Sequence, residues 1–327
     1  MSEKLRIGVI GCGGLGKRQA QIAKETEGVD LVGVADVNED SARQVAEELQ
    51  IGLAAGEYGE LLAANLDAVL VVTPTYTHKE IVLAAADAGL DVFCEKPMAT
   101  SVGDCDEMIA ATDAAGVQLM VGYVLRFYPA YAAMKEMTEN GRLGEVRLAW
   151  AVRMGGRPPA GIGAWRREKE KVGGLYSASC HQMDLLLWMG GPATEVTGHV
   201  NWGSFEDTDT EDSILVSWWA ENGAFGSLHS SQLYGVGGSE FGLGGTEGSV
   251  KLLDSNTIMF ADHEGNQETI EFDPVNGLAI ELGHFFDCCR SGEENCIPGK
   301  AGRDSLEMFE AAYRSSERRQ PVSLPLT

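Results

Sequence analysis

A lysine beside a proline gives the clearest chemical signal in this chain. Lys96 lies in Glu95-Lys96-Pro97, directly after the strand-like run Asp91–Cys94. A side chain at the carboxyl end of a parallel strand faces the crevice where α/β folds bind ligands. Because proline excludes the helical region for the residue before it, Lys96 is expected to be extended. We interpret Lys96 as a fixed cation at a ligand site.

A histidine on a predicted helix is the second candidate for chemistry. The pattern after Gly173-Gly174 predicts a helix at Leu175–Met189, and helical spacing places Ser177, His181 and Asp184 on one face. A histidine titrates near neutral pH and can accept the proton of a hydroxyl group. An acid one turn away can orient the ring and hold its tautomer. The alternative is a partly buried structural histidine, which is common for this residue type.

A glycine motif near the N-terminus indicates a dinucleotide site. Gly11-Cys12-Gly13-Gly14-Leu15-Gly16 follows the strand-like run Leu5–Ile10 and opens a helix. The first glycine allows a tight turn, the second lets the backbone approach a pyrophosphate, and the third packs the helix on the sheet. Amide groups at the start of that helix then face the phosphates. An ordinary glycine turn is the alternative.

The end of the second predicted strand favours NAD over NADP as the cofactor. Asp36 at this position can accept hydrogen bonds from the ribose hydroxyls of the adenosine, and it would repel a 2′-phosphate. The next residues, Val37 and Asn38, offer no arginine to neutralise such a phosphate. The alternative for Asp36 is an acid that stabilises a helix N-terminus.

Further cofactor contacts are expected after the strand-like run Ala68–Val72. Small polar residues there lie at the sheet edge that a dinucleotide crosses. The alternative is a proline-containing turn with a threonine helix cap, in which His78 helps to cap the helix. The expected cofactor contacts beyond the glycine motif and Asp36 are Thr73, Pro74, Thr75, His78, Glu95 and Lys96.

Composition narrows the class of protein. The 327 residues carry a formal charge of −24, which argues against nucleic acid or an anionic membrane as a partner. No apolar run approaches the roughly 18 residues of a membrane span, and the N-terminus lacks the pattern of a signal peptide. The seven cysteines are scattered without a C-x-x-C pair, which fits reduced thiols better than disulfides or a metal site. A cytoplasmic protein without a metal is expected.

The order of the predicted elements indicates two domains. Residues 1–121 alternate apolar strands with helices, which predicts a doubly wound parallel sheet of the Rossmann type. Residues 122–327 carry runs of strands without intervening helices, which predicts an α+β domain with an open, mostly antiparallel sheet. Strands in this second part are expected up to Met154 and at Glu195–Val200, Ser213–Trp219, Ala224–Leu233, Val250–Leu253, Thr257–Phe260 and Glu268–Phe272. Two helices, near Gly277–Cys289 and Gly302–Ser315, close the chain.

The chain resembles the Gfo/Idh/MocA oxidoreductases, the family of glucose–fructose oxidoreductase and inositol dehydrogenase. The resemblance rests on the glycine motif, Glu95-Lys96-Pro97 and Gly173-Gly174 through His181-x-x-Asp184, and it covers essentially the whole chain. It implies a sugar, inositol or related polyol as substrate, with Lys96 as the catalytic lysine and His181 as the general acid/base. It also implies that the open sheet mediates oligomers, so we expect a homodimer or homotetramer.

The resemblance supplies further substrate contacts. Tyr123 and Arg126 begin the segment between the domains, where the family commonly places a residue that faces substrate or cofactor; Arg126 has an interdomain salt bridge as its alternative. Trp165 and Arg166 match a segment near the substrate: a tryptophan can stack on a sugar, and an arginine can bind a carboxylate or hydroxyls. The alternative is an exposed basic loop. The expected substrate contacts are Lys96, Tyr123, Arg126, Trp165, Arg166, Ser177, His181 and Asp184.

One departure from the family pattern affects the proton chemistry. Many members carry an aspartate four residues before the histidine, whereas this chain has Ser177. Serine supplies no negative charge to raise the pKa of the histidine or to relay its proton. Either Lys96 and His181 act without a carboxylate relay, or the substrate class differs from that of the inositol dehydrogenases.

Together these features predict an NAD-dependent oxidoreductase that acts on a secondary alcohol of a sugar or polyol. Two alternatives stay open. One is an enzyme that cleaves glycosides by transient oxidation and elimination with tightly held NAD. The other is a non-catalytic sensor that binds a dinucleotide and a partner protein.

Overall fold

The computed structural model describes residues 4–156 and 161–326, which form two compact units. The first unit comprises Met1–Tyr123 and Asn276–Arg303, and the second comprises Val124–Val275 and Asp304–Thr327. The division expected from the sequence, after residue 121, differs from this in two respects: the boundary lies after Tyr123, and residues 276–303 return to the first unit. They do so through apolar contacts, as where the ring of Phe285 packs on Phe93 with centroids 5.7 Å apart.

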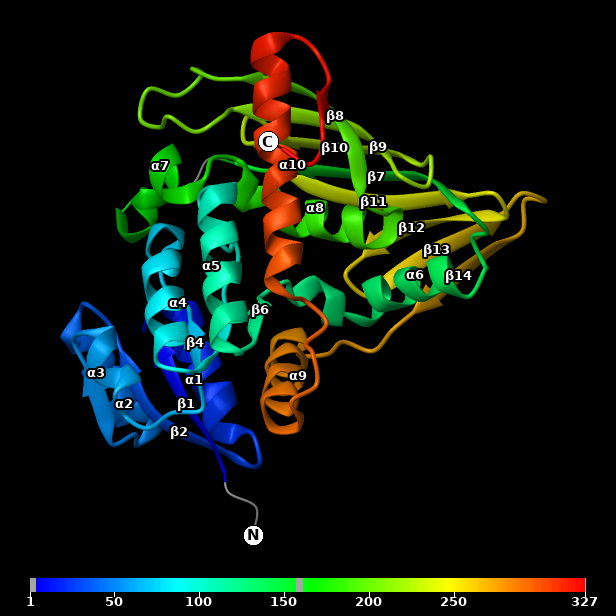
Figure 1. Ribbon diagram of the computed structural model, residues 1–327. Helices are drawn as coiled ribbons and strands as arrows, with labels where there is room; N and C mark the ends of the chain where they lie inside the picture. Colours follow the sequence, from blue (N-terminus) through cyan, green and yellow to red (C-terminus); the bar gives the residue numbers. More distant parts are fainter. Residues whose placement is uncertain (1–3, 157–160, 327) are drawn as a thin grey trace. The chain divides into compact units, whose positions relative to one another are not determined.

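A six-stranded parallel sheet forms the centre of the first unit. The strand order is β3-β2-β1-β4-β5-β6, so the doubly wound parallel sheet is confirmed; Figure 1 labels β1, β2, β4 and β6 of this sheet. The order reverses between β1 and β4, and in such sheets ligands bind outside the carboxyl ends of the strands at that point. The strands are β1 (Leu5–Ile10), β2 (Val29–Ala35), β3 (Leu53–Ala55), β4 (Ala68–Val71), β5 (Asp91–Cys94) and β6 (Leu119–Val121).

Helices connect these strands and pack on the sheet with their apolar faces. Alanine and valine side chains on them are buried, as are all four residues of the central strand β4. The helices of this unit are α1 (Gly14–Glu25), α2 (Glu39–Leu49), α3 (Tyr58–Leu62), α4 (His78–Asp87), α5 (Val102–Ala115) and α9 (Gly277–Ser291), with the 3-10 turn η1 (Thr75–Thr77).

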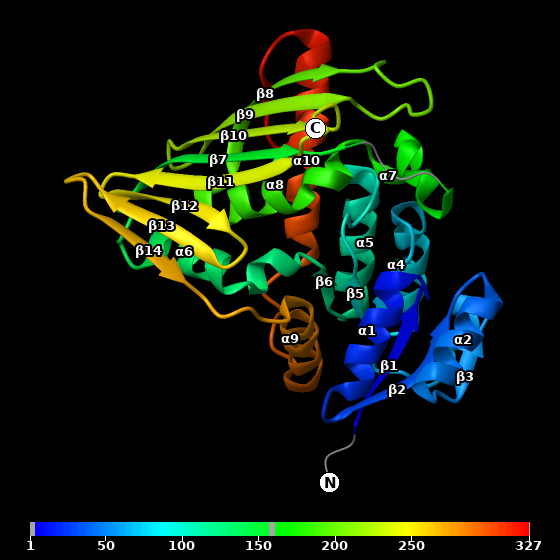
Figure 2. The same ribbon diagram turned by 180° about the vertical axis from the view of Figure 1, so that it is seen from behind.

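A nine-stranded sheet forms the second unit, in the order β14-β13-β12-β11-β7-β10-β9-β8-β15 (Figure 2). Among the described strands of this sheet, only the neighbours β7 and β10 run parallel, so the mostly antiparallel sheet is confirmed as well. The strands are β7 (Val146–Met154), β8 (Ala193–Asn201), β9 (Ser213–Ala220), β10 (Phe225–Ser231), β11 (Gly238–Gly245), β12 (Gly248–Asp254), β13 (Thr257–Asp262), β14 (Gln267–Glu271) and β15 (Val322–Ser323).

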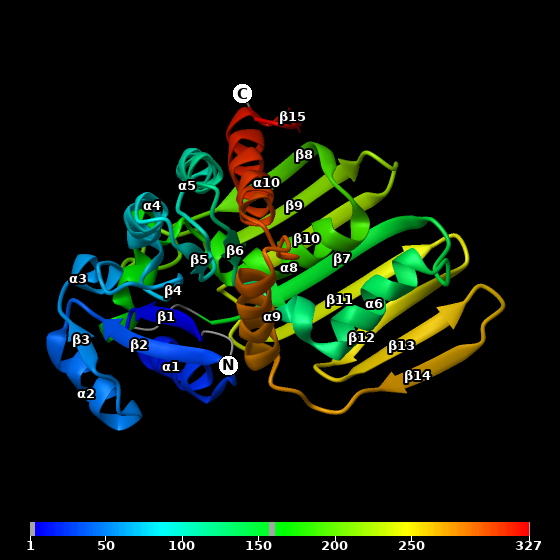
Figure 3. The same ribbon diagram turned by 60° about the horizontal axis from the view of Figure 1, so that its bottom comes forward.

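Helices lie across one face of this sheet (Figure 3), where α8 packs on β7 and β10 and α6 lies near β13. Side chains on that face, such as Ala149 and Leu228, are buried. The opposite face carries exposed apolar residues, considered below. The helical segments of this unit are α6 (Pro129–Glu139), α7 (Lys169–Val172) and α8 (Tyr176–Gly190), with the 3-10 turns η2 (Val124–Phe127) and η3 (Gly161–Arg167); α10 (Gly299–Arg318) begins in the first unit and continues in the second.

The strand β11 differs from the expectation drawn from the sequence, in which no strand lies there. Its sequence holds four glycines, a composition typical of turns. The structure nevertheless pairs β11 with β7 along its whole length. At Gly242 an added Cβ would lie 2.6 Å from the indole nitrogen of Trp150 on β7, so the glycine makes room for that ring. Cross-strand packing therefore outweighs the low strand propensity of glycine.

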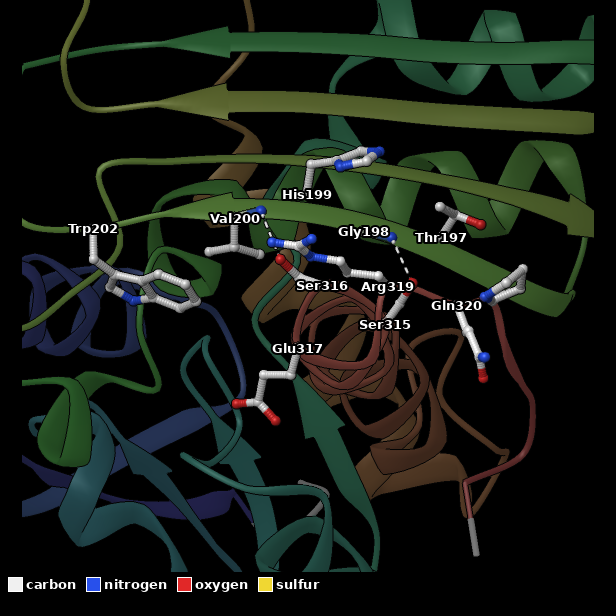
Figure 4. A pocket seen from close by; sticks show the side chains of 11 residues that line it. Thr197, Gly198, His199, Val200, Trp202, Ser315, Ser316, Glu317, Arg319 and Gln320 are labelled. Atoms are coloured by element: carbon white, nitrogen blue, oxygen red, sulfur yellow. Dashed lines mark hydrogen bonds between the residues drawn. The ribbon is translucent and has the colours of Figure 1, made fainter.

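The strand β8 is joined closely to α10 at the edge of the sheet. The hydroxyls of Ser315 and Ser316 accept hydrogen bonds from the backbone N–H groups of Gly198 and Val200, both at 3.1 Å (Figure 4). A Cβ added at Gly198 would overlap the backbone of Ala312. The shallow pocket drawn in Figure 4 lies at this junction and includes none of the site residues expected from the sequence.

Gly198→Ala is expected to destabilise the second unit, because the added methyl group meets helix backbone that cannot move aside. We expect a loss of about 1–3 kcal/mol in the free energy of unfolding. The thermal midpoint, followed by circular dichroism, should fall by about 2–4 °C per kcal/mol. The matched control is Gly244→Ala on β11, where the nearest atom to the added Cβ is Leu148 Cβ at 3.6 Å. Equal midpoints for the two variants would contradict the close packing of α10 on β8.

Candidate active site

The glycine motif forms a tight turn between β1 and α1. Gly11 has φ +103°, and a Cβ there would lie 2.5 Å from the carbonyl oxygen of Val72. A Cβ at Gly16 would overlap the carbonyl of Gly11. By contrast, a Cβ at Gly13 would meet no atom within 4 Å. Gly11 and Gly16 are therefore required by packing within the protein, whereas the position of Gly13 leaves open space beside the turn for a ligand.

The N-terminus of α1 is suited to phosphate. Its N-cap residue, Gly13, offers no side-chain hydrogen bond to the first turn, and that turn holds no acidic residue. The first amide groups of a helix lack partners within the helix and carry a partial positive charge. An exposed glycine turn followed by such a helix start fits the pyrophosphate of a dinucleotide. The residues present thus fit the expected cofactor.

A carboxylate is fixed next to this turn. Asp36 accepts hydrogen bonds from the backbone N–H of Cys12 at 2.7 Å and from that of Asn38 at 2.8 Å. The arginine of the following helix, Arg43, forms ion pairs with Glu39 and Asp40. The residue after Asp36, Val37, is apolar and 91% exposed, so neither it nor Arg43 places a cation beside the Asp36 carboxylate.

The thiol of Cys12 lies beneath the turn and is inert. It is buried and contacts the carbonyl of Ala35 at 3.6 Å. Burial, with a smaller contribution from the carboxylate of Asp36, raises the pKa of Cys12 to about 12. The backbone N–H of Cys12 is engaged by Asp36, so both parts of this residue stabilise the turn.

His78 connects the loops that follow β4 and β5. Its ring nitrogens lie 2.9 Å from the carbonyl oxygen of Thr73 and 3.0 Å from that of Pro97. The ring is buried, and burial lowers the pKa of His78. Thr73 also binds Thr77 through their hydroxyls at 2.8 Å. A neutral ring carries a single N–H, so His78 donates a hydrogen bond to one of these two carbonyl oxygens and packs against the other.

Glu95 is buried directly beside Lys96. Its carboxylate accepts hydrogen bonds from the side-chain amide of Gln19 at 2.7 Å and from the backbone N–H of Lys96 at 3.0 Å. Burial raises the pKa of Glu95, and the neighbouring Lys96 opposes that rise. Gln19 is not among the site residues predicted from the sequence. The signal that could have indicated it is a polar residue on the buried face of α1, between Gly16 and Ala23.

The helix expected around His181 is present as α8. His181 and Ser177 are half-buried on it, whereas Asp184 is 1% exposed. Both carboxylate oxygens of Asp184 accept from Arg126, at 2.9 Å from Nε and 2.5 Å from a terminal nitrogen. Burial raises the pKa of Asp184, and Arg126 opposes that rise.

Arg126 is therefore engaged within the second unit. Its guanidinium also lies 4.9 Å from the ring centre of Trp188 on α8. The ion pair with Asp184 connects η2 to α8 inside the second unit, so it is not the interdomain salt bridge that the sequence left open. Removing one partner of such a buried pair typically costs about 3–5 kcal/mol, because the other charge stays buried.

The remaining predicted site residues lie in different surroundings. Trp165 and Arg166 belong to η3, where the guanidinium of Arg166 stacks 4.3 Å from the centre of the Trp165 ring. Tyr123 is fully buried at the end of the first unit, an environment typical of a packing residue. Lys96 belongs to the first unit and His181 to the second.

Residues 4–156 and 161–326 contain neither a metal-binding cluster nor a membrane-spanning helix. Within these ranges no cluster of three or more His, Cys, Asp or Glu side chains is arranged to hold a metal ion. Within them, too, no helix is long and apolar enough to cross a membrane.

Comparison with known proteins identifies relatives along the chain. Myo-inositol 2-dehydrogenase of Thermotoga maritima is 31% identical over 340 aligned residues, which cover 98% of each chain. A 2,7-anhydro-N-acetylneuraminate hydratase of Mediterraneibacter gnavus is 30% identical over 274 residues, covering 80% of this chain and 73% of that protein. The crystal structure of a levoglucosan dehydrogenase in complex with NADH has the same fold, with a TM-score of 0.90 at 20% identity over 99% of this chain and 100% of that one.

Family models match both units. Residues 5–123 match the NAD-binding Rossmann fold of the oxidoreductase family, and residues 131–251 match the C-terminal domain of the same family. The glycine turn, the carboxylate of Asp36 and Lys96 at the end of β5 all lie in the first match. This chain therefore belongs to the Gfo/Idh/MocA family of NAD-binding oxidoreductases.

Proposed function

We propose that this protein is an NAD-dependent oxidoreductase that transfers a hydride between nicotinamide and a secondary alcohol of a sugar, inositol or related polyol. The observation that carries the proposal is the fixed position of Lys96. Its backbone is bound by the buried Glu95, and Glu95 is bound by Gln19 on the helix that starts at the glycine turn. A lysine whose backbone is held in this way next to a dinucleotide site can present its ammonium group to the oxygen of a bound alcohol.

Each catalytic residue would have a separate role. Lys96 would donate a hydrogen bond to the hydroxyl oxygen and stabilise the negative charge that develops on it. His181 would accept the hydroxyl proton as general base. NAD, when bound, supplies the hydride acceptor for the carbinol carbon. Since Ser177 carries no charge, the pair would work without a carboxylate at that position.

The roles of the lysine and the histidine can be tested with any alcohol that the protein oxidises. A panel of sugars and inositols with NAD should yield NADH and a ketone in equal amounts. Lys96→Met should lower kcat by at least about 100-fold and leave NAD affinity within a factor of two, because the lysine acts on the alcohol oxygen. His181→Asn should also lower kcat by at least about 100-fold and leave NAD affinity within a factor of two. The control is Lys24→Met, which removes an exposed lysine from α1. Turnover like that of the wild type in Lys96→Met would reject the assignment.

The hydratase relative supports a second candidate reaction. A protein 30% identical to this chain is named for hydration, a reaction without net redox change. An enzyme of that kind would oxidise its substrate transiently and return the hydride before product release. Product analysis separates the two reactions: a ketone with stoichiometric NADH supports the dehydrogenase, whereas a hydrated or cleaved sugar at catalytic amounts of NAD supports the alternative.

Asp36 is proposed to select NAD over NADP. Asp36→Ala should weaken NAD binding about tenfold, because hydrogen bonds from the ribose hydroxyls to a charged acceptor are lost. NADP binding should improve, because the repulsion of the 2′-phosphate is removed as well. Titration of NADH and NADPH fluorescence measures both constants. Glu47→Ala on the exposed face of α2 changes the net charge equally and should leave the ratio of the constants unchanged. An unchanged ratio in Asp36→Ala would refute the selective role.

The outer face of the nine-stranded sheet is proposed as the surface of a homodimer or homotetramer. Leu148, Phe225 and Trp219 lie in register across β7, β10 and β9, and they are 40%, 38% and 55% exposed. An exposed apolar row of this kind on a flat sheet is typical of a protein interface. Trp219→Glu should dissociate the oligomer in sedimentation velocity experiments. Tyr234→Glu, at an exposed aromatic outside the row, is the control. A wild-type monomer at micromolar concentration would exclude this interface.

A further inference from the structure

A loop rich in acidic residues connects β8 to β9 and contacts the segment that precedes α8. We call residues 204–212, with the sequence Ser-Phe-Glu-Asp-Thr-Asp-Thr-Glu-Asp, the acidic loop. The segment before α8, residues 165–175, carries Trp165 and Arg166 and leads through Gly173-Gly174 into the helix of His181. Both belong to the second unit. Taken alone, the acidic run would look like a solvated surface turn.

The first set of contacts fixes the segment at Arg167. Its carbonyl oxygen accepts hydrogen bonds from the hydroxyl of Thr208 at 2.8 Å and from the backbone N–H of Asp209 at 3.2 Å. Its guanidinium forms an ion pair with Asp207 at 2.5 Å. The carboxylate of Asp209 accepts from the backbone N–H of Lys169 at 2.6 Å. Both the backbone and the side chains of the segment are thus bound by the acidic loop.

The second set of contacts centres on Glu211, whose side chain is fully buried. One carboxylate oxygen lies 2.6 Å from the ammonium group of Lys169. The other accepts a hydrogen bond from the backbone N–H of Leu175 at 2.7 Å. The phenol of Tyr313 lies beside the same turn, and burial, with Glu211 as the next cause, raises the pKa of Tyr313.

The turn at Gly174 is shaped around the same carboxylate. Gly174 has φ +87°, a backbone conformation that residues other than glycine rarely adopt, and a Cβ there would overlap Glu211. The chain can therefore turn from α7 into α8 only because this position lacks a side chain. Glu211 is thus packed directly against the turn that leads into α8.

The helix α8 lacks a cap from its own sequence. Its N-cap residue, Leu175, makes no side-chain hydrogen bond to the first turn, and that turn holds no acidic residue. A negative charge and an acceptor near a helix N-terminus stabilise the helix. Glu211 supplies both from a different part of the chain. The loop that carries it is itself held by Gln232, whose side-chain amide donates to Thr210 at 3.0 Å.

We infer that Glu211 is a positioning residue: it fixes the start of α8, and with it His181, while the acidic loop holds the segment of Trp165 and Arg166. The catalytic consequence rests on the function proposed above, whereas the structural part does not. Glu211 would act through α8 and would touch neither substrate nor cofactor. Its loss should therefore affect the steps that involve His181 and leave cofactor binding, which belongs to the first unit, unchanged.

The test replaces Glu211 by glutamine and follows three measurements on the full-length protein. In Glu211→Gln, hydrogen–deuterium exchange at residues 174–179 should rise about tenfold or more, because the charged acceptor at the start of α8 is lost. Turnover of a polyol found active in the panel above should fall about 10- to 100-fold, mainly in kcat, as a base moves from its working position. The Kd for NADH should stay within a factor of two. Glu206→Gln, an exposed glutamate of the same loop, is the matched control and should change none of these values.

A second variant keeps the test valid if Glu211→Gln folds poorly. Lys169→Met removes the cation that balances Glu211, from a side chain that is 39% exposed. It should change exchange and kcat in the same direction as Glu211→Gln, because the buried carboxylate is left without its counter-charge. The double variant should be no worse than Glu211→Gln alone, because Lys169 acts through Glu211.

The outcomes separate the inference from the proposed function. Unchanged exchange at residues 174–179 in both single variants overturns the inference, and so does raised exchange with wild-type kcat. Raised exchange in variants of a protein whose wild type oxidises no polyol supports the placement of α8 by Glu211 and counts against the proposed function. Equal losses in Glu206→Gln would also overturn the inference, because the effect would then follow from net charge alone.

Discussion

The hydrogen bond between Gln19 and Glu95 is the interaction on which the first unit depends. It connects α1, which starts at the glycine turn, to the end of β5, where Lys96 follows. Both partners are buried, and burial raises the pKa of Glu95, so the carboxylate is costly to leave without a donor. This buried carboxylate lies directly beside Lys96, the proposed catalytic lysine. As a result, the cofactor turn and the lysine cannot shift independently of each other.

In the second unit, buried ion pairs hold the helix α8 in position. The helix α8 is held near its middle by the Arg126–Asp184 pair and at its start by Glu211, with Lys169 as counter-charge. Apolar packing alone would allow a helix to slide or rotate on a sheet, because hydrophobic contacts have little directional preference. Hydrogen-bonded ion pairs have a more defined geometry, so they restrict the rotation of the helix that carries His181.

Much of this architecture could be predicted from the sequence, because its signals are local. The glycine motif, the apolar strands of the first unit and the helix of His181 all follow from residue spacing. The strand β11 could not, since its glycines indicate a turn and the need for Gly242 becomes visible only in its packing against the ring of Trp150. The partnership of Arg126 with Asp184 and the burial of Glu211 were missed for a similar reason. Each depends on residues far apart in the chain, and an acidic run alone does not reveal which of its members is enclosed.

The serine caps on β8 have a consequence for how copies of this protein can associate. A strand edge with free N–H groups invites another strand to pair with it, and repeated pairing leads to open-ended fibres. The sheet ends here at β15, a two-residue strand that pairs with β8, and hydroxyl groups of α10 occupy two further N–H groups of β8. At the opposite edge, β14 carries the exposed Glu271, and its Glu268 forms an ion pair with Arg142. Covered and charged edges of this kind disfavour growth by strand addition, so a highly concentrated solution should not form fibres.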